Sequence, residues 1–524
     1  MRPRFLCLLA AAATLASFSS TAGRQWWAHV EFLASDAMEG RAAGSPAHQR
    51  AAEYVAGQFR SAGLKPGSGN SFLQPVNLLS RTILEAESHI VLVRNGKRET
   101  LALGKEIMFS TRVDLAPQVT APAVFAGHGL RISDAGHDDL AGLDLKGKVV
   151  VYLSGAPKHI SGPLQAHFSS AGERSRALHQ AGAVGVLPIS NPKNADIPWP
   201  RSLLTRLQPS MSLADPALDH SQLLRFSASF DPSRAEKLFE GSGHSFKELL
   251  AIADSGKPLP RFPLPFSIEA RAKLDRGKLL SHNVAGLLTG SDPKLRREVV
   301  VLSAHLDHIG RGGEINGDGI YNGAMDNASG IATLIEVARA FKHLRPRRSI
   351  AFVAVTAEER GLLGSRYFAA HPALPPGSSM VANINFDMFL PLHPMKSVLA
   401  LGMEESTLKH HLETVTQKLK LKMQRDDEPQ RNRFIRSDQY SFILRGVPAL
   451  ALKVGYDPGS AEEKLHKDWV RTRYHAPSDD LNQPVDLEAA AAFNRVIQEL
   501  ALEIANAPQT PRWNDTSFFR RFAR

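Results

Sequence analysis

The stretch "SIAFVAVTAEERGLLGSRYFAAH", residues 349–371, carries two adjacent glutamates between an apolar run and a helical pattern. The run 349–355 is short and uninterrupted, which is typical of a strand buried on both faces of a parallel sheet. Glu358 and Glu359 follow directly after it. Two carboxylates at the end of a buried strand indicate chemistry only if other reactive groups gather at the same place, so the neighbouring strands decide their meaning.

The alternation of apolar runs and helical patterns continues on both sides of this stretch. From His282 onward it includes "NVAGLL", "EVVVLSAHLD", "GIATLIEVARAFKHL", "MVANINFDMF", "STLKHHLETVTQKLKL" and "VPALALKVG". Strands that alternate with helices predict an α/β fold, here a three-layer α/β/α sandwich around a mixed, mostly parallel sheet. The active sites of such sheets gather at the carboxyl ends of the strands, so chemistry is expected there.

The 524 residues are enough for two or three domains, and the texture of the sequence divides them. Residues 26–67 predict two helices joined by a glycine-bearing loop. Dense proline, short strands and turns then indicate an inserted, mainly β module. We expect a signal peptide over 1–22, the N-terminal part of the main domain over 23–115, the insertion over 116–262, the larger part of the main domain over 263–507 and a C-terminal tail over 508–524.

The first 22 residues have the features of an export signal. Two arginines precede the apolar run Phe5–Ala16, and small residues follow it, which predicts cleavage after about Ala22. The alternative, a transmembrane anchor, requires roughly 20 apolar residues, more than this run offers. We therefore expect a periplasmic or extracellular protein without stable membrane insertion after cleavage. The single cysteine, Cys7, lies inside the signal, so the mature chain contains neither disulfides nor thiolate metal sites.

The charge balance is basic but moderate. Loss of Arg2 and Arg4 with the signal leaves 61 basic residues against 52 acidic ones, a net charge of about +9. The basic clusters at 345–348 and 520–524 are short, so a solvated face is favoured over nucleic-acid binding, and no nucleic-acid partner is expected.

Further reactive groups follow the other predicted strands. His305 and Asp307 are two residues apart on an extended chain, so their side chains are expected on the same side, where the carboxylate accepts the second N–H of the imidazole and fixes its tautomer for metal binding. Asp326 stands just before a helix, and its alternative role is that of a simple helix cap.

Three more groups complete the set: Glu359, Asp387 at the end of "NINFD", and His475 in a turn-rich loop. Each of them, taken alone, could equally be an ordinary solvated loop residue. Together with His305 and Asp326 they form two histidines and three carboxylates without sulfur, which suits borderline or hard divalent ions. One zinc usually needs three protein ligands, so five favour two metals that share a carboxylate. We assign Glu359 as ligand and Glu358 as general base, although adjacency alone leaves either order open.

Five motifs carry a family resemblance. "SAHLDH", "GAMDNASG", "TAEERGLLGS", "NFDM" and "YHAPSDD", in this order over residues 303–480, resemble the di-zinc peptidase family that includes bacterial leucyl aminopeptidases and the glutamate carboxypeptidase II group. Residues 40–67 resemble the N-terminal segment of the same family. The insertion, with "VFAGHGL" and "AGAVGVL", resembles a protease-associated (PA) domain.

The resemblance implies a role for each site residue. Two Zn²⁺ would be bridged by Asp326, with His475 and Glu359 completing one site and His305 and Asp387 the other; Co²⁺ or Mn²⁺ are candidate substitutes. Asp307 would orient His305, and Glu358 would act as the base.

The resemblance also points to groups around the metals. Tyr474 matches a tyrosine that stabilises the oxyanion in part of the family; its alternative is a ring packed beside the site. Ser437 and Asp438 would line the substrate pocket. Gln439 departs from the family, where a histidine is common, and this puts substrate contacts in doubt.

The sequence thus predicts an exported, zinc-dependent aminopeptidase that uses a metal-bridging water to release N-terminal residues of peptides. A carboxypeptidase or dipeptidase of the same fold is the nearest alternative, with Arg436 as the only evident partner for a substrate carboxylate. A metal-free binding protein, as the transferrin receptor is, and a one-zinc glutaminyl cyclase are disfavoured because the five ligands and the base are all present.

Overall fold

The computed structural model describes residues 21–67, 69–193, 195, 197–428, 431 and 433–523. The predicted signal peptide therefore lies outside the described residues except for its last two, which begin a helix over 21–33. Within the described part, no helix is both long and apolar enough to cross a membrane. The chain divides into two compact units: the first comprises Met1–Val76, Leu280–Asp427 and Arg436–Arg524, and the second comprises Asn77–Leu279 and Glu428–Ile435.

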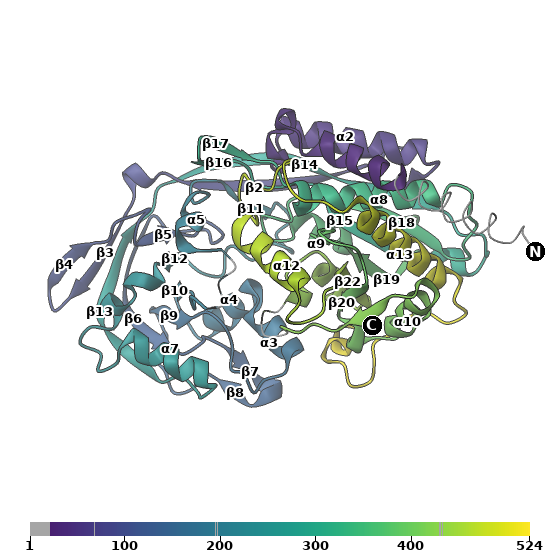
Figure 1. Cartoon of the computed structure of the whole chain (residues 1–524). Coiled ribbons are helices and arrows are strands. Elements are labelled where there is room, and N and C mark those ends of the chain that lie inside the picture. Colours follow the sequence, from purple (N-terminus) through teal and green to yellow (C-terminus); the bar gives the residue numbers. More distant parts are fainter. Residues whose placement is uncertain are drawn as a thin grey trace, which may run out of the picture. The chain divides into compact units, whose positions relative to one another are not determined.

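The first unit is built on a mixed sheet with a parallel centre (Figure 1). β15 lies between β18 and β19 and is parallel to both, and β22 adds in parallel to β19. β14 and β20 join in antiparallel orientation, and β21 is parallel to β20. The bounds are β14 Leu274–Leu288, β15 Glu298–His305, β18 Ser349–Val355, β19 Ser379–Asn385, β20 Ser397–Leu401, β21 Lys422–Gln424 and β22 Ala449–Val454.

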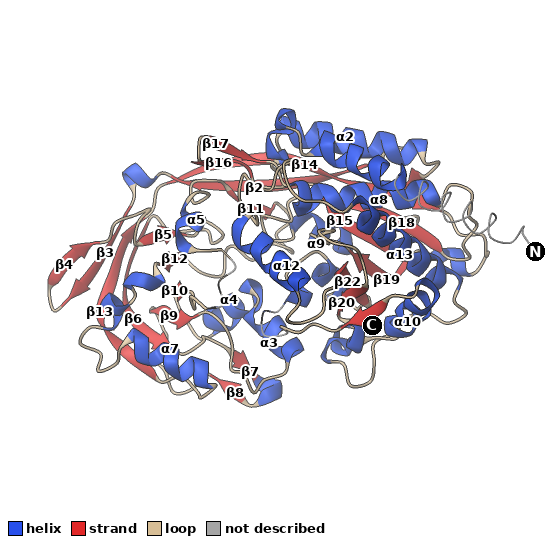
Figure 2. Cartoon of the chain, in the orientation of Figure 1, coloured by secondary structure: helices blue, strands red, loops and turns tan. Residues whose placement is uncertain are grey.

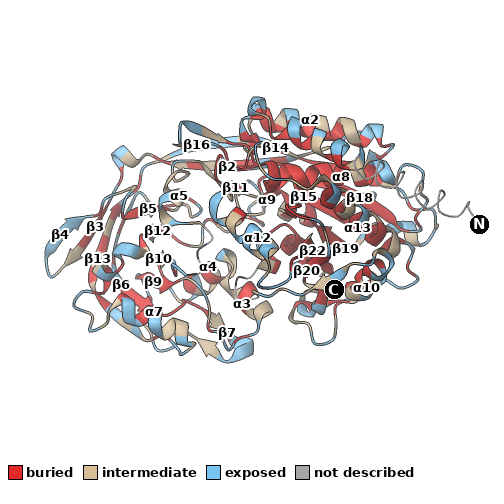
Figure 3. Cartoon of the chain, viewed as in Figure 1, coloured by how far each residue is buried: buried red, intermediate tan, exposed pale blue. Residues whose placement is uncertain are grey.

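Helices cover both faces of this sheet (Figure 2). Alternate residues of β15 belong to two different cores: Val300 and Leu302 pack in one cluster, Val299 and Val301 in the other. The first cluster includes α2 (Pro46–Ser61), α8 (Ser329–Ala340), α10 (Leu408–Leu419) and α13 (Leu487–Asn506), and the second includes α9 (Leu363–Ala370) and α11 (Gln439–Ile443). The predicted three-layer fold is therefore confirmed, and the central strands are buried along most of their length (Figure 3).

Helix α2 begins where the sequence predicts a helix. The hydroxyl of Ser45 accepts the N–H of His48 at 3.1 Å, and Pro46 takes the first helical position, where its missing N–H costs nothing. Gly63, with φ +82°, follows the helix end in the left-handed conformation that glycine adopts without strain.

The second unit has its own sheet, in the order β4-β3-β13-β6-β9-β10-β12-β5, and its own apolar core. The insertion was expected over 116–262, but the unit begins at Asn77 and ends at Leu279. The cause is long-range pairing: β3 (His89–Arg94) and β6 (Gln118–Ala126) both join β13 (Arg261–Arg271). The remaining strands are β4 Lys97–Thr100, β5 Ile107–Phe109, β9 Val149–Leu153, β10 Gly185–Ile189 and β12 Phe226–Phe230; α3 Gly162–Ser169, α4 Ala171–Gln180 and α7 Phe246–Ser255 are the longer helices.

The C-terminal stretch is packed into the first unit rather than free of it. Trp513 is buried and its indole N–H donates to the carbonyl of Gly446 at 2.9 Å. Phe519, in the short helix Phe518–Phe522, is fully buried. Residues 508–523 are thus part of the first unit, although composition alone indicated a tail.

Candidate metal centre

Three neighbouring strands deliver side chains to one edge of the sheet. β15 ends at His305, β18 is followed by Glu359, and β19 is followed by Asp387. Because β15 lies between the other two and runs parallel to them, their carboxyl ends meet. Asp326 arrives from the turn Ala324–Ala328 before α8, and His475 from the loop that precedes α13. The structure therefore brings all five predicted ligands together.

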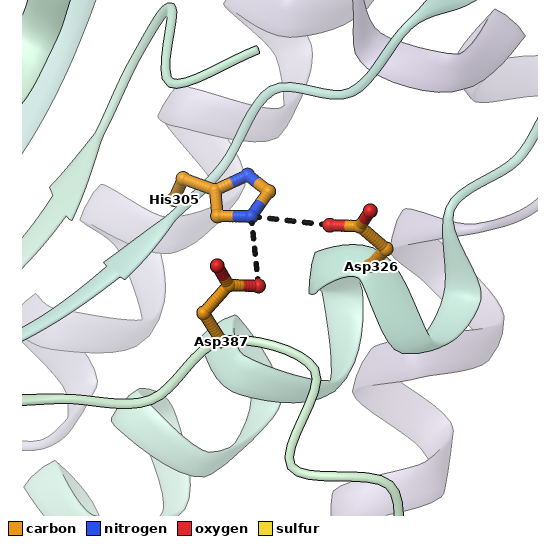
Figure 4. A group of neighbouring side chains, drawn as sticks. All are labelled: His305, Asp326 and Asp387. Atoms are coloured by element: carbon orange, nitrogen blue, oxygen red, sulfur yellow. Dashed lines mark hydrogen bonds and ion pairs between the residues drawn. The ribbon is translucent and has the colours of Figure 1, made fainter. Parts of the chain in front are cut away.

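The first group surrounds His305, which is fully buried (Figure 4). Its Nε2 lies 3.2 Å from Asp326 Oδ1 and 3.3 Å from Asp387 Oδ1. Its Nδ1 lies 3.0 Å from the carbonyl oxygen of Asp307. A carbonyl can only accept, so Nδ1 carries a proton, and Nε2 presents its lone pair between the two carboxylates when the ring is neutral. This is the tautomer that binds a metal through Nε2.

The second group surrounds His475. Its Nε2 lies 3.3 Å from Asp326 Oδ2 and 3.2 Å from Glu359 Oε2. Asp326 thus offers one oxygen to each histidine, Oδ1 to His305 and Oδ2 to His475. One carboxylate with its two oxygens turned to two donor groups is the arrangement that a bridging ligand requires.

A third histidine, His308, lies in the second group and carried no role in the sequence analysis. Its ring is fully buried, with Nδ1 2.7 Å from Glu359 Oε1 and 3.9 Å from Asp326 Oδ2. The donor atoms of His308, Asp326 and Glu359 lie within 4.8 Å of one another, as do those of His305, Asp326 and Asp387. The sequence contained one indication of this histidine, because His308 is the last residue of the motif "SAHLDH". It follows the end of β15, where the alternation of strand side chains no longer predicts which way a side chain points.

The sequence predicted that the carboxylate of Asp307 accepts the N–H of His305, and this prediction is wrong, because another group of Asp307 makes the contact. The carbonyl of Asp307 faces the ring, and its carboxylate accepts the N–H groups of Glu358 at 3.0 Å and Glu359 at 3.4 Å. The strand ends at His305, so the two-residue alternation on which the expectation depended does not reach Asp307. Asp307 therefore orients both the imidazole and the two glutamates, each through a different group.

The alternative role of Asp326 as a helix cap is filled by its neighbour. The side chain of Asn327 accepts the N–H of Gly330 in the first turn of α8 at 3.0 Å. Asp326 is held instead from outside: the carboxylate of Asp479 accepts the N–H groups of Met325 at 2.9 Å and Asp326 at 3.0 Å. The Asp326 side chain is thereby left to face the histidines.

A buried arginine supports the same loops. The guanidinium of Arg41 is fully buried and donates only to main-chain carbonyls: to Leu306 at 3.0 Å, to Gly323 at 3.0 Å, to Asn322 at 2.7 Å and to Leu33. Burial lowers the pKa of Arg41 to about 10, and the charges of Asp479 and Asp307 limit the decrease, so it remains a cation at neutral pH. It links the N-terminal segment to the turns that carry His305 and Asp326.

The two adjacent glutamates have opposite electrostatic surroundings in the metal-free chain. Burial raises the pKa of Glu358 well above its usual range, with the charges of Glu359 and Asp438 acting in the same direction. Burial also opposes ionisation of Glu359, but His475 and His308 outweigh it and hold the pKa of Glu359 well below its usual range. A charged Glu359 suits a ligand, and a Glu358 carboxylate whose proton affinity is raised suits a general base, which supports the assignment in that order.

The donor set fits divalent metal ions. Acidic oxygens and imidazole nitrogens converge on two points; the carboxylate of Asp326 is buried and those of Glu359 and Asp387 are partly buried, so a cation at these points would balance their charge. Both ring nitrogens of His308 and Oε1 of Glu359 are buried without a well-directed hydrogen bond among the described residues. Buried polar atoms of this kind need a partner, and a metal ion at these positions would supply it.

The groups predicted around the metals differ in their placement. Tyr474 is half-buried, with its ring 4.0 Å from that of His475, and burial raises the pKa of its phenol well above the usual range. Ser437 is buried and accepts an N–H of the Asn385 side chain at 3.0 Å. Asp438 is fully buried, and burial raises its pKa to about 7. Their contacts with substrate stay predictions.

Gln439 has an internal role. It is fully buried, and its side-chain oxygen accepts an N–H of Asn385 at 2.8 Å. Asn385 ends β19, two residues before Asp387. The departure from the family at this position is therefore accommodated by a hydrogen bond beneath the site.

Known proteins support the same reading of this region. Residues 283–501 match the model of Peptidase family M28. A probable zinc metalloprotease of Pyrenophora teres f. teres is 29% identical over 36% of this chain and 42% of its own length. Probable leucine aminopeptidase 2 of Aspergillus oryzae is 28% identical over 47% of this chain and 49% of its own length. The chain thus spans about half the length of these curated relatives.

The fold has a counterpart among solved structures. The aminopeptidase from Aneurinibacillus sp. strain AM-1 aligns with a TM-score of 0.53 over 94% of this chain and 94% of its own, at 19% sequence identity. This likeness concerns the fold alone. The five sequence motifs, over residues 303–480, lie within the region 283–501 that matches the family model. The similarity to Peptidase family M28 thus covers residues 283–501, the part of the chain that carries the five motifs.

Proposed function

We propose that the protein is a zinc-dependent aminopeptidase with a two-metal centre. The observation that carries the proposal is the division of the Asp326 carboxylate, which turns Oδ1 to His305 and Oδ2 to His475. His305 and Asp387 would hold one ion with Asp326, and His475 and Glu359 the other. The names of the relatives, a zinc metalloprotease and a leucine aminopeptidase, are consistent with this chemistry.

In the proposed hydrolysis the metal ions and the side chains of the protein have different tasks. Two zinc ions held here would lower the pKa of water and polarise the scissile carbonyl. Glu358 accepts the proton of the attacking water and delivers it to the leaving amine, which a carboxyl group with a raised pKa can do. Tyr474, beside His475, donates its phenolic hydrogen bond to the developing oxyanion.

An aminopeptidase is favoured over a carboxypeptidase or dipeptidase. A site for the substrate's C-terminal carboxylate normally contains more than one cation, because a bidentate guanidinium with a second donor fixes the group. Arg436 is an exposed cation close enough to Tyr474 to influence the pKa of its phenol, and it is the one candidate we assign to that alternative.

The location and the second unit complete the proposal. Residues 1–22 would direct export to the periplasm or the medium and then be removed, which leaves peptides as the substrates and no membrane anchor. The second unit, Asn77–Leu279 with Glu428–Ile435, would be a protease-associated domain without a catalytic group.

The test combines metal content with hydrolysis. Purified mature protein should contain two zinc ions per chain and release para-nitroaniline from leucine para-nitroanilide, and chelation should abolish the release reversibly. Two ions with cleavage only of C-terminally free peptides would establish the carboxypeptidase instead. Absence of bound metal would refute the proposal and favour a binding protein.

A further inference from the structure

The ring of His308 fills a space between the loops that carry the metal-site residues. Its ring is fully buried, and its backbone N–H faces the carbonyl of Arg41. A Cβ atom at Gly323 would lie 2.5 Å from Cγ and 2.6 Å from Cδ2 of this ring, and 2.2 Å from the carbonyl oxygen of Asp326, so a side chain there would collide with the imidazole and with the backbone beside it. Gly323 has φ +63° and stands three residues before Asp326. The fold therefore reserves space for His308 beside the bridging carboxylate.

The ring faces the same carboxylates as His475. His308 Nδ1 is 2.7 Å from Glu359 Oε1, and His475 Nε2 is 3.2 Å from Glu359 Oε2. Both nitrogens also face Asp326 Oδ2, at 3.9 Å and 3.3 Å respectively. The two rings are 5.8 Å apart between centroids and inclined by 74°. Two imidazoles from separate loops thus converge on one pair of carboxylates.

The short contact to Glu359 is not a well-directed hydrogen bond. Among the described residues, neither ring nitrogen of His308 nor Oε1 of Glu359 has a hydrogen-bond partner of acceptable geometry. Burying such groups without a partner is unfavourable, because their hydrogen bonds to water are lost and not replaced. Lone pairs that converge without a proton aligned between them are the arrangement expected of ligands to a common ion.

We propose that His308 is an additional metal ligand, and that the second group is a four-donor site made by His308, Asp326, Glu359 and His475. The inference rests on the metal centre of the proposed function. The first group, His305 with Asp326 and Asp387, keeps three protein donors. A zinc site with four protein donors is closed, whereas one with three retains a position for water. With one protein donor more, the His308 site would bind its ion more tightly than the His305 site, whose ion would exchange more readily.

The test is a Zn²⁺ titration of metal-free, full-length mature protein by calorimetry. Wild-type protein should bind two ions with unequal affinities. His308→Ala and His308→Asn should each weaken the tighter site by more than about 100-fold, beyond the roughly 10- to 100-fold that loss of a merely hydrogen-bonded partner costs, and should leave the weaker site unchanged. Asn places an amide where Nδ1 stands and still donates to Glu359, so it separates ligation from positioning. His410→Asn, on the exposed face of α10, is the matched control and should leave both affinities unchanged.

The outcomes separate this inference from the proposed function. Wild-type affinity for both ions in His308→Asn would make His308 a positioning residue and overturn the inference, while the aminopeptidase assay stays positive. Two unequal ions with the expected loss in both variants, but no hydrolysis, would support the inference and refute the activity. If the variants do not fold, X-ray absorption of wild-type protein with one equivalent of Zn²⁺ decides: two imidazoles on the first ion support the proposal, and one overturns it.

Discussion

The carboxylate of Asp479 accepts the main-chain N–H of Asp326 at 3.0 Å, and the carbonyl of Asp479 accepts the N–H of Ala324 at 3.0 Å. Asp479 stands four residues after His475, so one loop supplies a ligand and also fixes the backbone of the bridging carboxylate. The distance between the two ligands His475 and Asp326 is therefore set locally, by hydrogen bonds to a fully buried side chain.

Replacing Asp479 tests this coupling. Asp479→Asn keeps the shape but substitutes an N–H₂ group for one of the two accepting oxygens, which places a donor against a main-chain donor. We expect a loss of about 1–3 kcal/mol in the free energy of unfolding and a roughly 10- to 100-fold loss of zinc affinity. Urea denaturation and zinc titration measure the two. The adjacent Asp480→Asn, at a more exposed carboxylate, should change stability by less than about 0.5 kcal/mol; an equal effect there would argue against the coupling.

Substitution of Glu358 and substitution of Glu359 should affect turnover and zinc content differently. Glu358→Gln should retain the wild-type zinc content and lose roughly 10²- to 10⁴-fold in kcat, because the amide cannot accept the proton of water. Glu359→Gln should lower both kcat and the zinc content. Metal analysis beside steady-state kinetics on leucine para-nitroanilide checks both. Turnover near the wild-type level in Glu358→Gln would exclude it as the base.

The geometry of the Arg41 guanidinium matters more than its charge. Arg41→Lys keeps a cation but offers a single ammonium in place of a planar fork that reaches four carbonyls. We expect it to cost at least about 2 kcal/mol. Tryptophan fluorescence during urea denaturation follows the first unit, which contains four of the five tryptophans. Arg339→Lys, at a partly exposed guanidinium on α8, is the control and should be nearly neutral.

The metal-free protein should lose stability as pH rises. Burial raises the pKa of Asp438 to about 7, and although burial opposes it, Glu359 and Asp326 raise the pKa of His475 to about 10. Both groups bind protons more tightly in the folded chain. The contribution of Asp438 is lost between about pH 4 and 7, and that of His475 between about pH 6.5 and 10.

Thermal unfolding of chelated protein should therefore show a lower Tm at pH 9 than at pH 6. Saturating zinc should reduce the difference, since ligation requires the deprotonated ring. His475→Gln in the metal-free form should show a smaller decrease above about pH 6.5, because His305, whose pKa is also raised, although burial opposes it, by Asp387 and Asp326, retains its own contribution. A metal-free Tm that increases from pH 6 to pH 9 would contradict the assignment.

The packed C-terminal stretch should contribute to stability. Phe519→Ala removes a fully buried ring and should cost about 3–5 kcal/mol. Phe518→Ala, at the half-buried neighbour, should cost less. Equal and small effects in both variants would show that the stretch is dispensable for the first unit.

The identity of the elements could be predicted from local pattern. Runs such as 349–355 and 298–305 are mostly apolar because parallel strands are buried on both faces, so they can be recognised as strands without knowledge of their partners. The ends of these runs also identified His305, Glu359 and Asp387, because the chain direction alone brings the carboxyl ends of parallel strands to one edge. Residue chemistry then indicated divalent metal.

Other features depended on contacts between distant segments. The extent of the second unit follows from strands that pair across more than a hundred residues, which composition does not encode. Asp307 acts through its carbonyl on one ligand and its carboxylate on two others, since the strand ends before it. His308 and Arg41 matter because of the atoms packed around them. The sequence by itself determined which residue types meet at the sheet edge, since pattern and direction are local; the direction in which each side chain points was decided only by the tertiary structure, because loop residues have no period to fix it.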